Sequence, residues 1–494
     1  MKNQELELYK NLPSHNVPPR ADAMIENLRA MGYTIQTAIA DLLDNCIAAQ
    51  AKNIWVNFDW KLQSSTISIL DDGCGMTNEE LIEAMRPSTK NPNELRDSKD
   101  LGRFGLGLKT ASFSQCRQLT VASKKTHDIS YWAWDLDYIK QTKSWDLINL
   151  KPQEHFIIQL DKLATGTLVV WEKLDRVVSQ KKNIDEEKSK ANYYALAETV
   201  KKHLAMVFHR YIEGKKIKIF FNNREIESWD PFIKGNSYSQ ITEDCLQYGT
   251  VKVKGYVLPH KSKLTEEEYK KAEGIHGWNA QQGFYIYRNE RLLVAGDWLG
   301  MFRKEDHYKL ARIMVDLPNT TDDAWQLDIK KSVAIPPQEI KEQLRAIAGR
   351  VRTQAVEVFR HKGKTILRKY PNNQFQPIWQ EKIRHGKRFY EINRENEVVK
   401  TLLESSKEAK TAINQLLRFV EEAIPIELIM IKQSEEPALQ GKAFEDSNHD
   451  GMREMMKLLF QSLIKNGKTE EQAKGYLMSI EPFNLYPQYV ETLS

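Results

Sequence analysis

The amino-acid sequence predicts an α+β protein in which two mixed α/β segments precede a mainly helical one. Alternating stretches such as "NIWVNFD" (53–59) and "STISILD" (65–71) predict strands that pair. Apolar residues at helical spacing over 34–51 predict a helix beside them. Beyond residue 337 the pattern becomes mainly helical. A chain of 494 residues is too long for one core. The expected domains are residues 1–213, 214–336 and 337–494.

In the first segment, local patterns define each element. Ile35, Ile39 and Leu42 recur on one face of the second expected helix. "TNEE" (77–80) is a capping box, so a short helix should begin near Thr77. The expected helices cover 21–31 and 34–51, and the expected strands cover 53–59, 65–71, 118–123, 129–136, 155–160 and 167–172.

The later segments continue this succession. A long helix is expected at 188–213, and "KIKIFFNNREI" then predicts a hairpin. The polar stretch 432–451 predicts a loop or linker. The remaining expected strands lie near 251–257, 283–288 and 311–316, and the remaining helices at 337–361, 395–423 and 449–466.

Composition narrows the functional class. The chain is 41% apolar and carries 11 Trp, so a packed core is expected. No apolar run reaches the length of a membrane span, and the first residues lack the apolar core of a signal peptide. The four cysteines are scattered without a C-x-x-C pair, which argues against a zinc site or disulfide framework. We therefore expect a cytoplasmic protein that does not bind membranes.

Three motifs of the first segment carry the candidate chemistry. Asp41 and Asn45 lie one helical turn apart and so share a face of the helix 34–51. In "LDDGCGM" a strand ends in Asp71, and the chain then turns through two glycines. "LGRFGLGLKTAS" (101–112) is a glycine-rich turn before an expected helix, where free N–H groups favour phosphate and Lys109 adds positive charge. The candidate nucleotide-binding residues in these motifs are Asn45, Asp71, Gly73, Gly75, Met76, Gly102, Arg103, Phe104, Gly105, Leu106, Gly107 and Lys109.

The two commonest nucleotide motifs do not fit this pattern. A P-loop requires G-x-x-x-x-G-K-S/T, whereas Leu108 separates Gly107 from Lys109 here. A G-x-G-x-x-G fingerprint does not occur either. A different kind of nucleotide site is therefore expected.

The order of the three motifs resembles the GHKL ATPase superfamily, which includes gyrase-type topoisomerases, heat-shock ATPase chaperones, histidine kinases and MutL. "GRFGLGLKTAS" and "YIYRNERLL" look most like the MORC-type branch and its bacterial relatives. The resemblance covers about residues 15–175 strongly and 214–335 more weakly. It implies a two-layer α/β sandwich that binds ATP (a Bergerat-type domain), an α/β transducer-like domain, and a helical C-terminal region.

The resemblance also implies roles for single residues. Asn45 matches the asparagine that binds Mg²⁺, and Asp71 matches the aspartate that reads the adenine amino group. Thr167, helped by Gly166, matches the threonine that supports the adenine contact. Gly73 and Gly75 match the positions where the backbone passes the base, and Gly102, Gly105 and Gly107 match the phosphate lid.

Asp41 matches the general base that activates water, a position normally held by glutamate in the hydrolysing branches. Aspartate is one methylene shorter, and a misplacement of about 1 Å can cost about 10²-fold in rate, so slow turnover is expected. Asp44 is the alternative base, but at position +3 it is expected to point elsewhere on the helix. In the transducer-like domain, Lys330 or Lys331 is expected to contact the γ-phosphate.

One segment carries the basic charge of the protein. Between Lys341 and Arg388 there are 13 Lys or Arg against three Glu, a net charge of +10. Basic residues with interleaved aromatics can bind nucleic acid, although a solvated helix face explains the charge equally well. We expect an ATPase that uses Mg²⁺, dimerises on ATP binding and clamps double-stranded DNA through 341–388, in a bacterial defence, restriction-linked or repair system. The alternatives are a chaperone-like ATPase acting on protein partners and a nucleotide-locked scaffold with little turnover.

Overall fold

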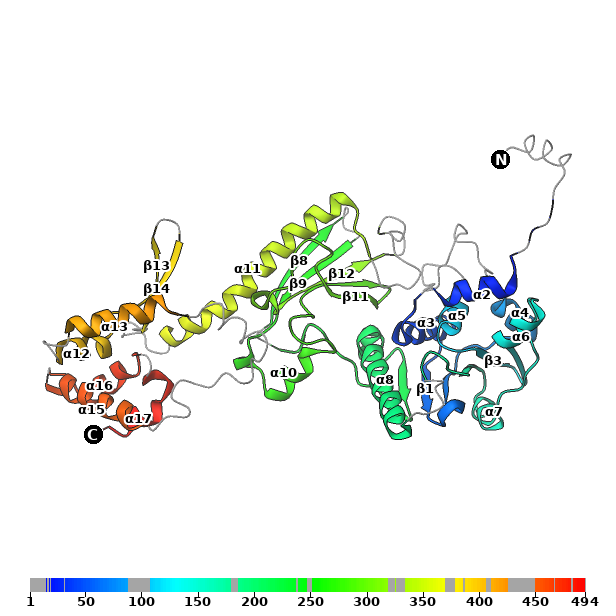
Figure 1. The fold of residues 1–494 in the computed structure, drawn as a ribbon, viewed down its shortest axis with the longest axis horizontal. Coiled ribbons are helices and arrows are strands. Elements are labelled where there is room, and N and C mark those ends of the chain that lie inside the picture. Colours follow the sequence, from blue (N-terminus) through cyan, green and yellow to red (C-terminus); the bar gives the residue numbers. More distant parts are fainter. Residues whose placement is uncertain are drawn as a thin grey trace. The chain divides into compact units, whose positions relative to one another are not determined.

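The computed structural model describes most of the chain. Contacts divide the chain into two units, Met1–Ala355 and Val356–Ser494, and each is described by itself (Figure 1). The described residues are 15, 17, 19–30, 32–87, 107–178, 185–236, 239–246, 251–318, 325, 334–368, 378–384, 387–405, 410–424, 449–465, 467–480 and 483–493.

The first sheet has seven strands in the order β4-β3-β5-β2-β1-β6-β7. All neighbours are antiparallel except β1 and β6, which are parallel. The predicted pairing of 53–59 with 65–71 is confirmed, with Ile54 opposite Asp71. The strands are β1 (Asn53–Asp59), β2 (Thr66–Asp71), β3 (Gln118–Lys125), β4 (Asp128–Asp135), β5 (Gly166–Glu172), β6 (Lys218–Phe221) and β7 (Arg224–Glu225).

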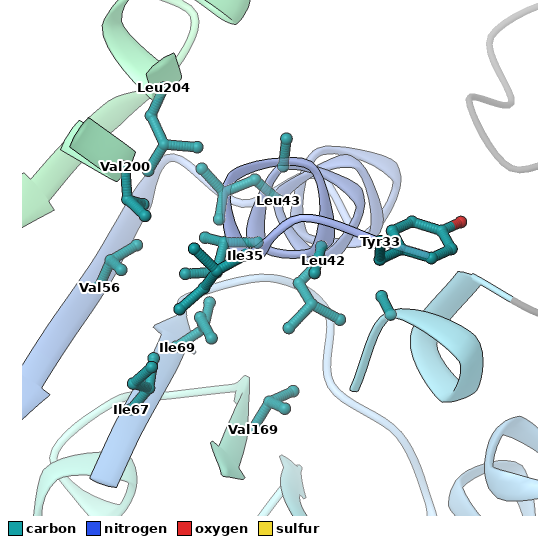
Figure 2. Close-up of a cluster of buried hydrophobic side chains, with 14 of the residues drawn as sticks. Tyr33, Ile35, Leu42, Leu43, Val56, Ile67, Ile69, Val169, Val200 and Leu204 are labelled. Atoms are coloured by element: carbon teal, nitrogen blue, oxygen red, sulfur yellow. The ribbon is translucent and has the colours of Figure 1, made fainter. Parts of the chain in front are cut away.

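Helices cover one face of this sheet, and their apolar residues form the main core with alternate residues of the strands. In Figure 2, Leu42 and Leu43 of α3 lie over Val56, Ile67 and Ile69, with α8 beside them. The two-layer α/β sandwich is therefore present. The helices contributing to this core are α2 (Ala21–Arg29), α3 (Ile35–Ala48), α4 (Asn78–Met85), α5 (Gly107–Phe113), α6 (Leu136–Thr142), α8 (Glu186–Val207) and α9 (His209–Glu213).

The other face of the sheet explains one wrong prediction. Residues 155–160 were expected to form a strand but lie in the helix α7 (Glu154–Asp161). Phe156 and Leu160, one turn apart, pack against Leu168 and Val170 of β5 in a separate apolar cluster. Because a short apolar run fits either period, only this packing decides between strand and helix.

Two local predictions in this region are confirmed. Thr77 and Glu80 form the capping box that starts α4. The hairpin predicted from "KIKIFFNNREI" is β6–β7, in which Asn222 and Asn223 both have positive φ. The first sheet therefore extends past the limit expected at residue 213, and the three domain limits remain a prediction.

The second sheet has five strands in the order β11-β10-β12-β9-β8. Strands near 251–257, 283–288 and 311–316 are confirmed, whereas β8 and β11 were not predicted. The main core continues into this sheet through buried aromatics, including Tyr285 and Tyr287. The strands are β8 (Gln240–Leu246), β9 (Val251–Val257), β10 (Gly283–Arg288), β11 (Arg291–Asp297) and β12 (Ala311–Leu317), and α10 (Glu266–Glu273) follows β9.

The C-terminal third is mainly helical, as predicted, with an unpredicted hairpin. The helix expected at 337–361 is the longer α11, and the helix expected at 395–423 is divided into α12 and α13. Residues 432–448, most of the polar linker predicted at 432–451, lie outside the described residues. The elements are α11 (Gln338–Arg368), β13 (Trp379–Arg384), β14 (Lys387–Ile392), α12 (Glu397–Ser405), α13 (Lys410–Glu422), α15 (Asp450–Lys465), α16 (Glu470–Leu477) and α17 (Pro487–Glu491). Across the described helices, none combines the length and apolar character needed to cross a membrane.

Candidate functional site

The alternation of side chains along the strands brings three polar residues to the face covered by α3. Ile67 and Ile69 of β2 point into the main core, so Asp71 points the same way. The same parity applies to Thr167 on β5 and Ser123 on β3. Thr167 lies opposite both Asp71 and Ser123 in the sheet register. The structure thus brings together the two predicted adenine-binding residues.

Asp71 is a buried carboxylate in an environment that disfavours its charge. It is 4% exposed, and its Oδ1 accepts a hydrogen bond from the Gly73 N–H at 2.8 Å. Burial raises the pKa of Asp71 from 3.8 to about 6, although the hydrogen bonds from Gly73 and the Cys46 thiol oppose this rise. Such a group gains from a ligand that donates a hydrogen bond to it.

Ser123 joins the separate motifs, although it belongs to none of them and sequence reasoning missed it. Its hydroxyl accepts a hydrogen bond from the Met76 N–H at 2.9 Å and donates to the Gly166 carbonyl at 3.0 Å. The same hydroxyl is 3.0 Å from Thr167 Oγ1. A single buried serine therefore ties the loop after β2 to the start of β5.

The glycines of this loop allow the backbone to approach neighbouring strands. Gly75 has φ +64°, and a Cβ there would lie 2.0 Å from the carbonyl oxygen of Lys124. A Cβ on Gly166 would lie 2.2 Å from the carbonyl oxygen of Asp71. At Gly73 it would meet Ala49 and Asp71 at 2.8 Å. The packing of the protein itself therefore requires glycine at these positions, whatever ligand binds.

The helix α3 presents its polar residues in two environments. Thr34 caps the helix by accepting a hydrogen bond from the Thr37 N–H. Asn45 is exposed, which leaves its amide accessible to a ligand. Asp41 is buried, and its Oδ2 accepts a hydrogen bond from the Tyr33 hydroxyl at 3.0 Å.

The second sheet supplies a residue that sequence reasoning missed. Arg291, the first residue of β11, donates from Nε to Asp44 Oδ1 at 2.7 Å and from Nη2 to Asp41 Oδ1 at 3.3 Å. Asp44 was expected to point away from Asp41, and this expectation is wrong. Residues three apart on a helix are neighbours, so one guanidinium reaches both carboxylates. "YIYRNERLL" contains this arginine, but the strand that places it was not predicted.

The ammonium of Lys109 is buried and binds a backbone carbonyl group of the protein itself. Its Nζ donates to the carbonyl oxygen of Ala84, the penultimate residue of α4, at 2.9 Å, and the side chain is 2% exposed. Burial lowers the pKa of Lys109 to about 8. A phosphate contact by Lys109 stays a prediction, and it would require the ammonium to leave this carbonyl.

Several predicted residues lie outside the described ranges. These are Gly102, Arg103, Phe104, Gly105 and Leu106 of the lid and Lys330 and Lys331 of the transducer-like domain. Gly107 starts α5, and a Cβ there would meet nothing within 4 Å. The roles assigned to this set stay predictions.

A second cluster with ligand-type side chains lies around α9. His209 Nδ1 is 2.9 Å from Glu213 Oε1, and these groups lie close to a carboxylate oxygen of Asp230. The Lys234 ammonium is 3.6 Å from Glu213 and so supplies positive charge to the cluster. A cavity of about 750 Å³ borders Glu213, Asp230 and Lys234, and none of its described lining residues belongs to the predicted nucleotide site.

The chemistry of Asp71 and that of Asn45 each fit one part of ATP with Mg²⁺. An ionised carboxylate only accepts hydrogen bonds, so Asp71 matches a ligand such as adenine that presents an amino group. Asn45 offers an accessible amide oxygen, the hard kind of ligand that Mg²⁺ takes in small numbers beside phosphates and water. The same two positions are those that sequence reasoning assigned to adenine and metal.

Comparison with known proteins gives the class of this module. The family model described as "Histidine kinase-, DNA gyrase B-, and HSP90-like ATPase" matches residues 33–167, from Tyr33 to Thr167. This stretch includes Asp41, Asn45 and Asp71, and it is similar to the ATP-binding modules that this family description covers.

Within that class, the chain is similar to a MORC-type protein. "ATPase morc-1" of Caenorhabditis elegans is 33% identical over 89 residues, which make up 18% of this chain and 10% of that protein. The chain therefore spans about a tenth of the length of the curated relative that it matches. The suspected resemblance to GHKL and MORC-type ATPases is confirmed.

Proposed function

We propose that this protein hydrolyses ATP with Mg²⁺ and uses the ATP-bound state to close a dimeric clamp on DNA. The observation that carries the ATPase proposal is the convergence of Asp71, Thr167 and the glycine turn beneath α3, in a module matched by a GHKL family model. The resemblance to MORC-type ATPases is the basis for extending this proposal to dimerisation, to DNA binding and to a role in defence or repair.

Each group would have a distinct role. Asp71 and Thr167 would hold the adenine, and Asn45 would hold Mg²⁺, which neutralises charge on the phosphates. Asp41 would take a proton from the attacking water at a carboxylate oxygen. The Tyr33 hydroxyl and the Arg291 guanidinium would hold this carboxylate in place while it does so.

The experiment is steady-state ATP hydrolysis by the purified protein with and without double-stranded DNA. The variants are Asp41→Ala, Asp41→Glu and Asn45→Ala, with Asp161→Ala on α7 as the matched control of an acid outside the site. We expect turnover in the wild type and the control, and loss of turnover in both site alanine variants. Binding of ATP without turnover, with hydrolysis gained in Asp41→Glu, would favour the nucleotide-locked scaffold.

The DNA proposal rests on the charge of 341–388 rather than on a contact. Part of that charge is structural, because the Arg352 guanidinium lies 4.0 Å from the ring centroid of Phe302 and 3.8 Å from that of Tyr308. Cations stacked on aromatic rings contribute to packing and are poorly placed for phosphate. We therefore assign the proposed DNA contact to basic residues of 341–388 other than Arg352.

Reversing the charge of Lys362, Lys364 and Arg368 to Glu tests this assignment. The matched control reverses three exposed residues of α8: Lys188, Lys190 and Lys202. We expect the first variant to bind double-stranded DNA more weakly with a shallower salt dependence, since each lost phosphate contact lowers the slope by about 0.9. Equal loss in both variants would indicate general charge attraction, and no DNA binding by the wild type would favour a protein partner.

Size-exclusion chromatography with a non-hydrolysable ATP analogue tests the clamp. A shift from monomer to dimer on nucleotide binding is expected, and it should be absent in Asn45→Ala. A wild-type protein that binds the analogue and stays monomeric would contradict the clamp.

A further inference from the structure

The contact of Arg291 with α3 joins two parts of the chain at the proposed general base. Arg291 begins β11, and it forms ion pairs with Asp44 and Asp41, which lie 247 and 250 residues away in sequence. All three side chains are at most 4% exposed. The Phe208 ring, 5.9 Å from the guanidinium carbon, covers the arginine from the end of α8. We call these three charged residues the clasp.

The two arms of the clasp differ in length. The bond from Arg291 to Asp44 is 2.7 Å, typical of a strong charge-assisted hydrogen bond, whereas the contact with Asp41 is 3.3 Å. Asp44 therefore anchors the guanidinium, and the second arm reaches Asp41. Because Tyr33 donates to the other oxygen of Asp41, both oxygens of that carboxylate have a donor, which fixes its orientation.

The β10–β11 hairpin is held by contacts other than the clasp as well. The Tyr211 hydroxyl donates to the Asn289 carbonyl oxygen at 2.7 Å, and Lys216 pairs with Glu290 at 2.5 Å. Asn289 and Glu290 form the tip of the hairpin, and both have positive φ, a strained conformation that these contacts hold. Buried ion pairs are costly to desolvate. Attachment of the hairpin alone therefore does not explain why charged residues are buried on α3, the helix that carries the proposed general base.

We propose that Arg291 is a positioning residue that orients Asp41 for catalysis and makes this orientation depend on the position of the second sheet. This inference rests on the proposed ATPase function. The physical reason is the short reach of aspartate: its carboxylate needs external donors to hold it at a productive angle, and one such donor, Arg291, belongs to β11. Displacing the β10–β11 hairpin relative to α3 then changes the geometry of the base directly.

Full-length protein carrying Arg291→Lys, Arg291→Met or Asp44→Asn tests the inference. The measurements are kcat for ATP, the Kd of a non-hydrolysable ATP analogue, and thermal unfolding. We expect Arg291→Met to lower kcat by about 10²-fold, as for a misplacement of about 1 Å, with the Kd changed by less than about threefold. Arg291→Lys keeps the charge but lacks the fork that reaches two carboxylates, so an intermediate loss is expected.

Asp44→Asn tests whether Asp41 must be positioned, because this variant leaves the Asp41 carboxylate itself in place. It weakens the anchor and leaves Asp41 and Arg291 intact, so kcat should fall with an unchanged Kd. Lys216→Ala, which removes an exposed contact of the same hairpin, is the matched control and should retain kcat within about twofold.

The outcomes distinguish this inference from the proposed function. A wild type without turnover overturns the ATPase proposal, and the positioning role fails with it. An active wild type whose kcat is unchanged in Arg291→Lys and Asp44→Asn overturns the positioning role alone. Equal losses of kcat and analogue binding, or a loss in Lys216→Ala as large as in Arg291→Lys, would show a structural role only. If Arg291→Met does not fold, the lysine and Asp44 variants decide the question.

Discussion

Replacing Asp71 by Asn should make the nucleotide-free protein more stable and weaken its binding of ATP. The rise in the pKa of Asp71 from 3.8 to about 6 corresponds to about 3 kcal/mol. A folded-state pKa above the unfolded value means that the contribution of this group to stability is present below about pH 4 and is lost as the pH rises through 6. Near pH 7.5 the ionised carboxylate therefore destabilises the fold.

Asparagine removes that charge and keeps an oxygen for the Gly73 N–H. The gain in the free energy of unfolding should approach about 3 kcal/mol at pH 7.5 and shrink towards zero near pH 4. The side-chain amide also presents N–H donors where a carboxylate presents only acceptors. A donor facing the amino group of adenine cannot accept its hydrogen bond. We expect ATP affinity to fall at least about tenfold, the effect of about 1.4 kcal/mol.

Thermal unfolding of the nucleotide-free protein between pH 4.5 and 8, and calorimetric titration with an ATP analogue, measure the two effects. Asp72→Asn is the matched control, because both oxygens of Asp72 accept hydrogen bonds, from the N–H groups of Lys52 and Asn53 and from the Asn53 amide. It should not stabilise the protein. A stability gain in Asp71→Asn that is absent, or that is equal at pH 4.5 and 7.5, would refute the argument from burial.

Three further predictions test the packing around the site. Gly75→Ala should lower the free energy of unfolding by roughly 2 kcal/mol or more, because φ is +64° and the new Cβ would meet a carbonyl oxygen. Gly107→Ala, where the Cβ would meet open space, should be tolerated. Chemical denaturation compares the two variants, and equal stability would contradict the strain assigned to Gly75. Ser123→Ala leaves the Met76 N–H without its acceptor and should cost about 1–3 kcal/mol and weaken binding of the ATP analogue, so a variant with wild-type stability would be unexpected. Thr77→Ala removes the cap of α4 and should cost about 1 kcal/mol, seen as faster amide hydrogen exchange in that helix alone.

Sequence reasoning predicted much of the fold because the signals involved are local. Helical spacing in 34–51 and strand alternation in 53–59 and 65–71 predicted elements that the structure contains. The capping box at Thr77 is likewise confirmed. Period and cap chemistry are properties of a few adjacent residues, so they need no knowledge of distant partners. For the same reason the order of the motifs was sufficient to indicate the GHKL class.

Other features depended on packing between distant segments. Residues 154–161 became a helix because their apolar pair fits against the outer face of β5. Ser123 carries no motif, and it matters only because the sheet register sets it opposite Thr167.

The sequence by itself indicated the resemblance to GHKL ATPases, the candidate residues Asp41, Asn45 and Asp71, and the helices and strands that carry them. Only the tertiary structure decided that Asp41 and Asp44 share the guanidinium of Arg291. Helical spacing states which residues share a face, but it holds no information about a partner some 250 residues away. That partner is set by how the second sheet packs against α3, a long-range property of the folded chain.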